Sequence, residues 1–148
     1  NETEAYTQKL MALSKALSQT EHAFYKASKQ LEKFEKTLKF TTSNQANLTK
    51  EVYALRSEMH ALKLQLNGSA AKAEVGEKEQ LTIRDRIYFA ASGLTGNSYG
   101  QTKLHTESYD MAKAMFDELQ PKMEQFSKVK VPALAKKLEA SGAPAVLD

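Results

Sequence analysis

The first third of the chain carries the pattern that decides its fold, in the stretch YTQKLMALSKALSQTEHAFYKASKQLEKFEKTL from Tyr6 to Leu38. Core-type residues recur there at spacings that alternate four and three, with one polar exception, Thr20. The positions are Tyr6, Leu10, Leu13, Leu17, Thr20, Phe24, Ala27, Leu31, Phe34 and Leu38. This heptad stripe predicts one long α-helix over residues 3–40. At about 1.5 Å per residue the helix would be roughly 55 Å long, so we expect it to be an arm of a bundle or coiled coil.

A second stripe predicts a second helix over residues 46–67. Its apolar positions are Leu48, Val52, Leu55, Met59, Leu62 and Leu66. The intervening TTSNQAN consists of turn and capping residues, and Asn67 with Gly68 is typical of a left-handed helix end. Because so few residues connect the two helices, we expect an antiparallel hairpin.

Two further helices are predicted in the second half. One covers residues 82–92, where Thr82 and Asp85 suggest a capping box, and its apolar positions are Ile83, Ile87, Tyr88 and Ala91. The other covers residues 102–141, with apolar positions Leu104, Ala112, Met115, Phe116, Leu119, Met123, Phe126, Leu134 and Leu138. Proline disrupts helical hydrogen bonding, so Pro121 predicts a kink near Gln120, and Pro132 a kink or break near Val131. The predicted fold is all-α, a single domain over residues 1–148 forming an elongated antiparallel four-helix bundle with two long and two short helices.

Composition narrows the function classes. The 148 residues include no cysteine, which excludes disulfides, thiol catalysis and zinc sites built on cysteine. The net charge is +3, with ten Lys/Arg against seven Asp/Glu in residues 1–66 and a balance in the rest. This excess is too mild to indicate nucleic-acid binding. No apolar run approaches the roughly 20 residues needed to span a membrane.

The stretch SGLTGNSYGQT, residues 92–102, is the nearest approach to a phosphate-binding loop. A Walker-type loop needs two glycines separated by four residues, then Lys and Ser or Thr, after a strand. Here Gly96 and Gly100 are separated by three residues, Gln101 replaces the lysine, and a helix precedes. We interpret the stretch as a bend in which Gly93 and Thr102 cap the flanking helices, and in which Tyr99 is a candidate partner contact.

No catalytic, cofactor or metal site is predicted. His22, His60 and His105 fall on separate predicted helices, and none follows an acidic residue at the three-residue spacing of Glu-x-x-His metal pairs. The predicted core positions offer no paired carboxylates or nucleophile with a base. The chain is therefore not expected to be an enzyme or to hold a cofactor.

Two groups of residues are candidate partner contacts. Lys29, Lys33 and Lys36 lie opposite the heptad stripe on the first helix and form a basic face. Tyr88, Tyr99 and Tyr109 would form a ligand site at one end of the bundle if the module binds a small molecule.

The residues from NLTKEVYALRSEMHALKLQLNG through TIRDRIYFAASGLTG to LEASGAP give the chain a resemblance to a known family. This part, about residues 45–145, resembles the helical C-terminal region of secreted bacterial sortilin-like or BNR-repeat "glycosyl hydrolase" proteins. The resemblance implies an exported protein in which a β-propeller precedes this segment, and any hydrolase activity would belong to that propeller. The favoured hypothesis is a non-catalytic interaction module that docks on other domains of its parent or on a protein partner. A coiled-coil homodimerisation module and a ligand-binding bundle are the alternatives.

Overall fold

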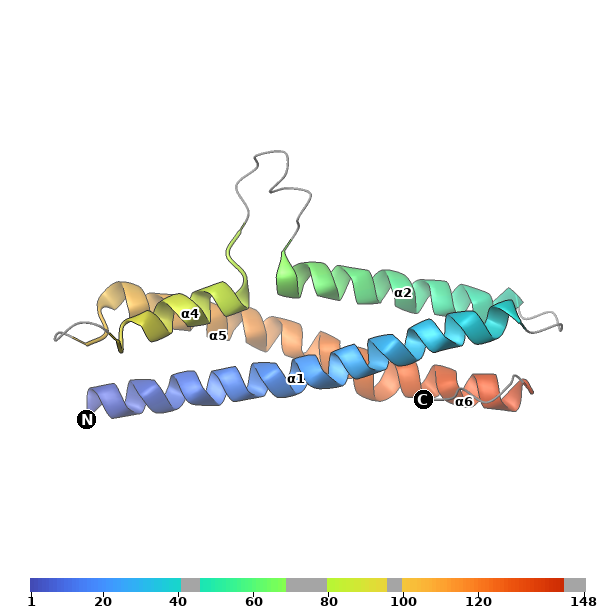
Figure 1. Ribbon diagram of the computed structural model, residues 1–148, viewed down its shortest axis with the longest axis horizontal. Coiled ribbons are helices and arrows are strands. Elements are labelled where there is room, and N and C mark those ends of the chain that lie inside the picture. Colours follow the sequence, from blue (N-terminus) through green and yellow to red (C-terminus); the bar gives the residue numbers. More distant parts are fainter. Residues whose placement is uncertain (41–45, 69–79, 96–99, 143–148) are drawn as a thin grey trace. The chain divides into compact units, whose positions relative to one another are not determined.

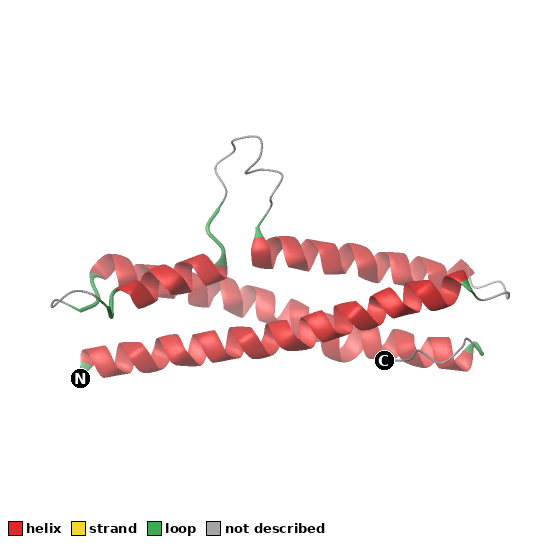
Figure 2. Ribbon diagram, in the orientation of Figure 1, coloured by secondary structure: helices red, strands yellow, loops and turns green. Residues whose placement is uncertain are grey.

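The computed structural model describes residues 1–40, 46–68, 80–95 and 100–142 of the chain. Over these residues it consists of helices and short loops and contains no strand (Figure 2). The α-helices, labelled in Figure 1, are α1 (Glu2–Lys39), α2 (Ala46–Asn67), α4 (Ile83–Ser92), α5 (Lys103–Glu124) and α6 (Val131–Ala140), and the π-helix η1 (Gln125–Lys130) lies between α5 and α6. The last three follow one another without a loop. The all-α class is therefore confirmed, with two long helical arms, α1 and α5 to α6, and two shorter helices.

The helices pack as two compact units. Unit 1 comprises Asn1–Gln19 and Lys63–Gln120, and unit 2 comprises Thr20–Leu62 and Pro121–Asp148. Both long arms contribute residues to each unit. Each unit therefore contains one part of α1 and one part of the arm from α5 to α6, and the expectation of a single domain stays a prediction.

The heptad stripe of α1 is the buried face of that helix. Every stripe residue is buried except Leu38, which is half-buried, and even Thr20 is only 7% exposed. The regular spacing places these side chains on one side of the helix, where burial removes apolar surface from water. The stripe predicted from sequence is confirmed as the core face of α1.

Unit 1 is built from the start of α1 together with α4 and α5. Tyr6, Leu10 and Ala90 form a buried cluster, and Ile87, Ala91, Leu94 and Tyr109 pack against it. The Ser108 hydroxyl donates a hydrogen bond to the Arg86 carbonyl at 2.8 Å and joins α5 to α4. Two sequence expectations are wrong here, because Tyr88 and Leu104 are 81% and 66% exposed. Ala90 and Ser108 are the neighbouring residues that face inward instead.

Unit 2 is built from the rest of α1 together with α2, η1 and α6. The rings of Phe24 and Phe126 lie 5.3 Å apart between α1 and η1. Two ion pairs join α2 to the last arm: Glu58 pairs with Lys130 of η1 at 3.0 Å, and Glu51 pairs with Lys137 of α6. The earlier residue of α2, Glu51, pairs with the later lysine, Lys137, and the later residue, Glu58, pairs with the earlier lysine, Lys130. The two segments are therefore antiparallel. Arg56 and Glu35 pair at 3.6 Å between α2 and α1, as expected for the predicted hairpin.

The two internal prolines do not break the last arm. Pro121 lies inside α5, and Pro132 is in the first turn of α6, directly after the π-helix. Phe126 lies within the π-helix and Val131 directly follows it; their positions differ by five, and both side chains are fully buried. A π-helical turn uses i to i+5 hydrogen bonds, and the Val131 amide donates to the Phe126 carbonyl in this way. The predicted kink or break at Pro132 is therefore replaced by a widened turn that keeps Val131 in the core.

Two predicted helix ends are confirmed. Thr82 and Asp85 form a complete capping box, in which the Thr82 hydroxyl accepts from the Asp85 amide at 3.1 Å and Asp85 accepts from the Thr82 amide at 3.0 Å. After α2, Gly68 has φ = 75°, the left-handed conformation that glycine adopts at low cost.

Candidate interaction surfaces

The three tyrosines proposed for one end of the bundle do not share an environment. Tyr88 projects into solvent from α4, while Tyr109 of α5 is half-buried. The Tyr109 ring meets the edge of the Tyr6 ring, with centroids 6.3 Å apart. Tyr99 lies outside the described residues. The described part of the chain therefore gives Tyr109 a packing role and leaves Tyr88 as an exposed side chain.

Tyr6 is the polar contact in the core of unit 1. Its hydroxyl donates a hydrogen bond to the Ala90 carbonyl at 2.7 Å. Burial, with a smaller contribution from the Asp110 carboxylate, raises the pKa of the Tyr6 phenol above its usual value. The phenol is therefore held neutral and acts as a structural donor.

A histidine organises the start of α5. The Nδ1 atom of His105 accepts a hydrogen bond from the Thr102 amide at 3.0 Å and lies 2.8 Å from the Thr102 hydroxyl. The ring stacks on Phe89 with centroids 5.0 Å apart. It also covers Gly93, where an added Cβ would lie only 2.7 Å from the ring. Thr102 is confirmed at the start of α5, with His105 completing the cap.

Gly93 is confirmed at the end of α4, but for a different reason than the usual left-handed cap. Its φ is −69°, in the ordinary helical region. Glycine is required there because the His105 ring approaches the backbone too closely for a side chain.

A half-buried arginine, Arg86, joins α4 to α5. The Arg86 Nη1 atom contacts the Met111 sulfur at 3.4 Å, and its buried Nε atom has no hydrogen-bond partner among the described residues. Phe89 and Met111 are partly exposed on the same two helices. Arginine beside aromatic and methionine side chains is a composition enriched at protein interfaces.

The predicted lysine face lies in unit 2. Lys26, Lys29, Lys33 and Lys36 each follow a core residue of α1 by two positions, which at 100° per residue places them on the opposite side. We call these four residues the lysine strip. Lys26, Lys29 and Lys36 are exposed and Lys33 is half-buried. Over the described ranges, no carboxylate pairs with the three exposed lysines.

The same spacing continues to Phe40, which follows Leu38 by two positions. Phe40 lies just beyond the end of α1 and is 82% exposed. Phe40 therefore places one large apolar side chain in water at the end of the lysine strip.

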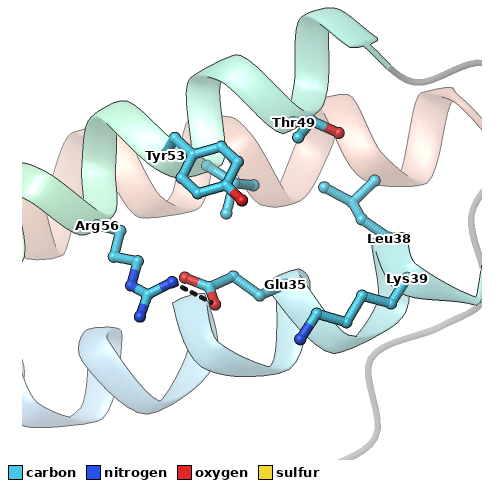
Figure 3. Close-up of a pocket in the computed structure, with 7 residues that line it drawn as sticks. Glu35, Leu38, Lys39, Thr49, Tyr53 and Arg56 are labelled. Carbon is cyan, nitrogen blue, oxygen red and sulfur yellow. Dashed lines mark ion pairs between the residues drawn. The ribbon is translucent and has the colours of Figure 1, made fainter.

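A small pocket lies beside the strip, between the last turns of α1 and the first turns of α2. Its volume is about 190 Å³, and it is lined by Glu35, Leu38, Lys39, Thr49, Val52, Tyr53 and Arg56. Figure 3 shows Glu35 and Lys39 of α1 facing Tyr53 and Arg56 of α2. Leu38 and the buried Val52 supply apolar wall, and Tyr53 is 61% exposed at the opening.

The side chains that line this pocket carry more positive than negative charge. The Arg56 guanidinium lies 3.6 Å from the Glu35 carboxylate, which compensates that acid. Lys39 has no such partner among the described residues and carries the remaining positive charge. The pocket thus combines an apolar wall with an uncompensated cation, and it is smaller than the 300–1,000 Å³ of a usual small-molecule site.

Sequence reasoning identified the lysine strip but missed the pocket. The pocket requires α1 and α2 to meet in one particular register, and its residues are separated by a turn. The available signal was Tyr53, an aromatic residue outside the predicted apolar stripe of α2.

The described residues contain no group of three His, Asp or Glu side chains placed to hold a metal ion. Within the described segments, none of the helices has the length and apolar character needed to cross a bilayer.

Comparison with protein-family models, with curated proteins and with solved structures gives no match to this chain.

Proposed function

We propose that this chain is a non-catalytic interaction module of a larger exported bacterial protein, and that it docks on another domain of that protein or on a protein partner. The exported context is supported by the resemblance to the helical C-terminal regions of secreted propeller proteins. The interaction role is supported by the chain's own surface.

The observation that carries the proposal is the set of large apolar side chains left in water. Several lie on regular helices whose buried faces are already filled. The exposed residues are Met11, Phe40, Tyr53, Leu64, Leu81, Tyr88, Phe89, Leu104, Met111 and Val129. Single exposed apolar residues are ordinary, but aromatic and methionine side chains grouped with unpaired Arg or Lys are typical of interfaces. Such grouping occurs at Phe89, Met111 and Arg86, whose buried Nε atom has no hydrogen-bond partner among the described residues, and again at Phe40 with the exposed Lys29 and Lys36.

Homodimerisation through the heptad stripe is a less favoured alternative. The stripe is buried within the units of one chain, so pairing in trans would have to compete with those contacts. A ligand site at the tyrosine end is also less favoured, because Tyr88 and Tyr109 occupy different environments.

Site-specific photo-crosslinking tests the interaction role. A photoreactive phenylalanine analogue would replace Phe40, Tyr53, Tyr88 or Leu104 one at a time in the native host, and adducts would be identified by mass spectrometry. We expect a discrete adduct with one protein at one or more of these four positions. The control is the analogue at exposed Ala140, whose helix neighbours three and four positions earlier are Lys137 and Lys136 rather than apolar residues. Absence of a discrete adduct at all four positions would contradict the proposal.

A further inference from the structure

The two units differ in charge. Unit 2 has twelve Lys/Arg and eight Asp/Glu residues, a net charge of +4, whereas unit 1 has nine and ten, a net charge of −1. All of the chain's positive excess therefore belongs to unit 2. A protein surface with one sign of charge attracts partners of the other sign and speeds their association.

Within unit 2, many cations are already used in structure. Lys130, Lys137 and Arg56 pair with carboxylates of a neighbouring helix. The exposed lysines of the strip are different, because no described carboxylate lies within pairing distance of them. From Lys26 to Lys36 the strip spans eleven residues of helix, about 15 Å, and its three exposed lysines, Lys26, Lys29 and Lys36, supply the ammonium groups without a carboxylate partner among the described residues.

The lysine strip continues into the pocket. Lys39 lines the pocket and follows Lys36 by three positions, so the two side chains are neighbours on the α1 surface. Leu38 and the buried Val52 line the same pocket as its apolar wall, together with the exposed Tyr53. A ligand on this surface would meet positive charge along its length and one apolar recess at its end.

We propose that this surface binds an acidic peptide segment that carries one large apolar side chain. The apolar side chain occupies the pocket between α1 and α2, and the acidic side chains lie on Lys39 and the lysine strip. This inference rests on the proposed interaction role and names the partner's chemistry. A pocket of about 190 Å³ suits a single side chain better than a drug-sized molecule.

A peptide is favoured over an anionic membrane for a geometric reason. Membrane-binding amphipathic helices lay a continuous apolar face into the lipid beside their basic residues. The apolar face of α1 is instead buried in the protein, and among the described residues beside the strip the exposed apolar features are Phe40 and the pocket. A recess for one side chain matches a peptide anchor.

Fluorescence anisotropy with a labelled peptide tests the proposal. The probe is Glu-Asp-Glu-Leu-Phe-Glu-Asp-Glu, and its comparison peptides replace Leu-Phe by Ser-Ser or every acid by its amide. We expect the protein to bind the probe and neither comparison peptide. Added salt should weaken the binding, because exposed charges are screened beyond about 10 Å at 0.1 M ionic strength.

Matched pairs of variants test whether the probe binds at the lysine strip and the pocket. Lys29→Glu with Lys36→Glu should weaken probe binding by about tenfold or more, since both attractions become repulsions. The control, Lys122→Glu with Lys136→Glu, makes the same charge change at exposed positions elsewhere in unit 2 and should change it less than about twofold. Tyr53→Ala should weaken binding, and Tyr88→Ala in unit 1 should not. Circular dichroism confirms that each variant is folded.

Several results would overturn the inference. One is an equal loss of probe affinity in the Lys29/Lys36 variant and in the Lys122/Lys136 control. Another is that the Ser-Ser peptide binds as tightly as the probe. A third is that the protein binds phosphatidylserine vesicles but not the probe. Homodimerisation that disappears with the Lys29 and Lys36 reversals would assign the surface to a second copy instead. If the probe fails while crosslinking at Tyr88 or Leu104 gives an adduct, the interaction role stands and only this inference falls.

Discussion

At the scale of single residues, the core of unit 1 depends on a polar group held among apolar neighbours. Tyr6 is 6% exposed, and its hydroxyl donates to the carbonyl of Ala90. A buried phenol that makes this bond stabilises the fold only while it keeps its proton. Because the pKa is raised above 10.0, the stabilisation is fully present below about pH 10 and is lost as the pH rises through the folded-state pKa.

We therefore predict that Tyr6→Phe lowers the free energy of unfolding by about 1 kcal/mol near neutral pH, the typical value of one hydrogen bond. Above pH 10 the difference between the variant and the wild type should shrink, because ionisation penalises only the tyrosine. Urea unfolding at several pH values measures this. Tyr88→Phe is the control, and a difference that grows with pH would contradict the assignment.

Gly93 and His105 give a second prediction at this scale. Gly93→Ala should cost about 1–3 kcal/mol, because its Cβ would overlap the His105 ring. In a His105→Ala background the same change should cost clearly less. A double-mutant cycle by thermal unfolding measures the coupling. Equal costs in the two backgrounds would show that the close approach to the Gln101 backbone, 3.1 Å, is responsible instead.

At the scale of elements, the last helical arm has one residue more than a regular α-helix can place in the core. Phe126 and Val131 are both buried although their positions differ by five rather than four, and the π-helix Gln125–Lys130 accommodates the extra residue. Without that turn Lys130 would face the core, where an unpaired ammonium group is costly. Lys130 instead reaches Glu58 on α2.

This account predicts that deleting exposed Val129 together with Pro132→Ala converts the arm to a regular α-helix with its core residues in place. The substitution is included because proline inside an α-helix costs about 3 kcal/mol. The variant should stay folded and lose no more than about 1 kcal/mol of stability, the cost of an average substitution. Deleting exposed Ala114 from α5 is the control and should unfold the protein, since it rotates every later core residue by 100°. Circular dichroism and thermal unfolding separate the two outcomes.

At the scale of the whole molecule, the heptad stripe of α1 is used within the chain. Its residues are buried against the other helices of their own units, so no free seam remains for a second copy. We predict a monomer whose mass is independent of concentration from low micromolar to submillimolar protein. Light scattering measures this, and a concentration-dependent dimer would favour the coiled-coil alternative.

Much of the fold could be predicted from the sequence because the helices are strongly periodic. The α1 stripe and the Thr82 capping box are local signals, and each is present in the structure. The errors in predicted burial concern residues at the edge of a helix's buried face. Tyr88 was expected to be buried and is exposed, whereas Ala90 is buried, because the packing partner of α4 decides which border residue faces inward.

The sequence by itself determined that this protein is all-α, because heptad spacing requires helices that bury one side. It also determined which face of α1 is basic, since that follows from the same period. Only the tertiary structure decided how Pro132 is accommodated, that His105 caps α5 against Gly93, and that α1 and α2 leave a pocket beside Lys39. These features depend on contacts between residues far apart in the chain, and a local period carries no information about the register of such contacts.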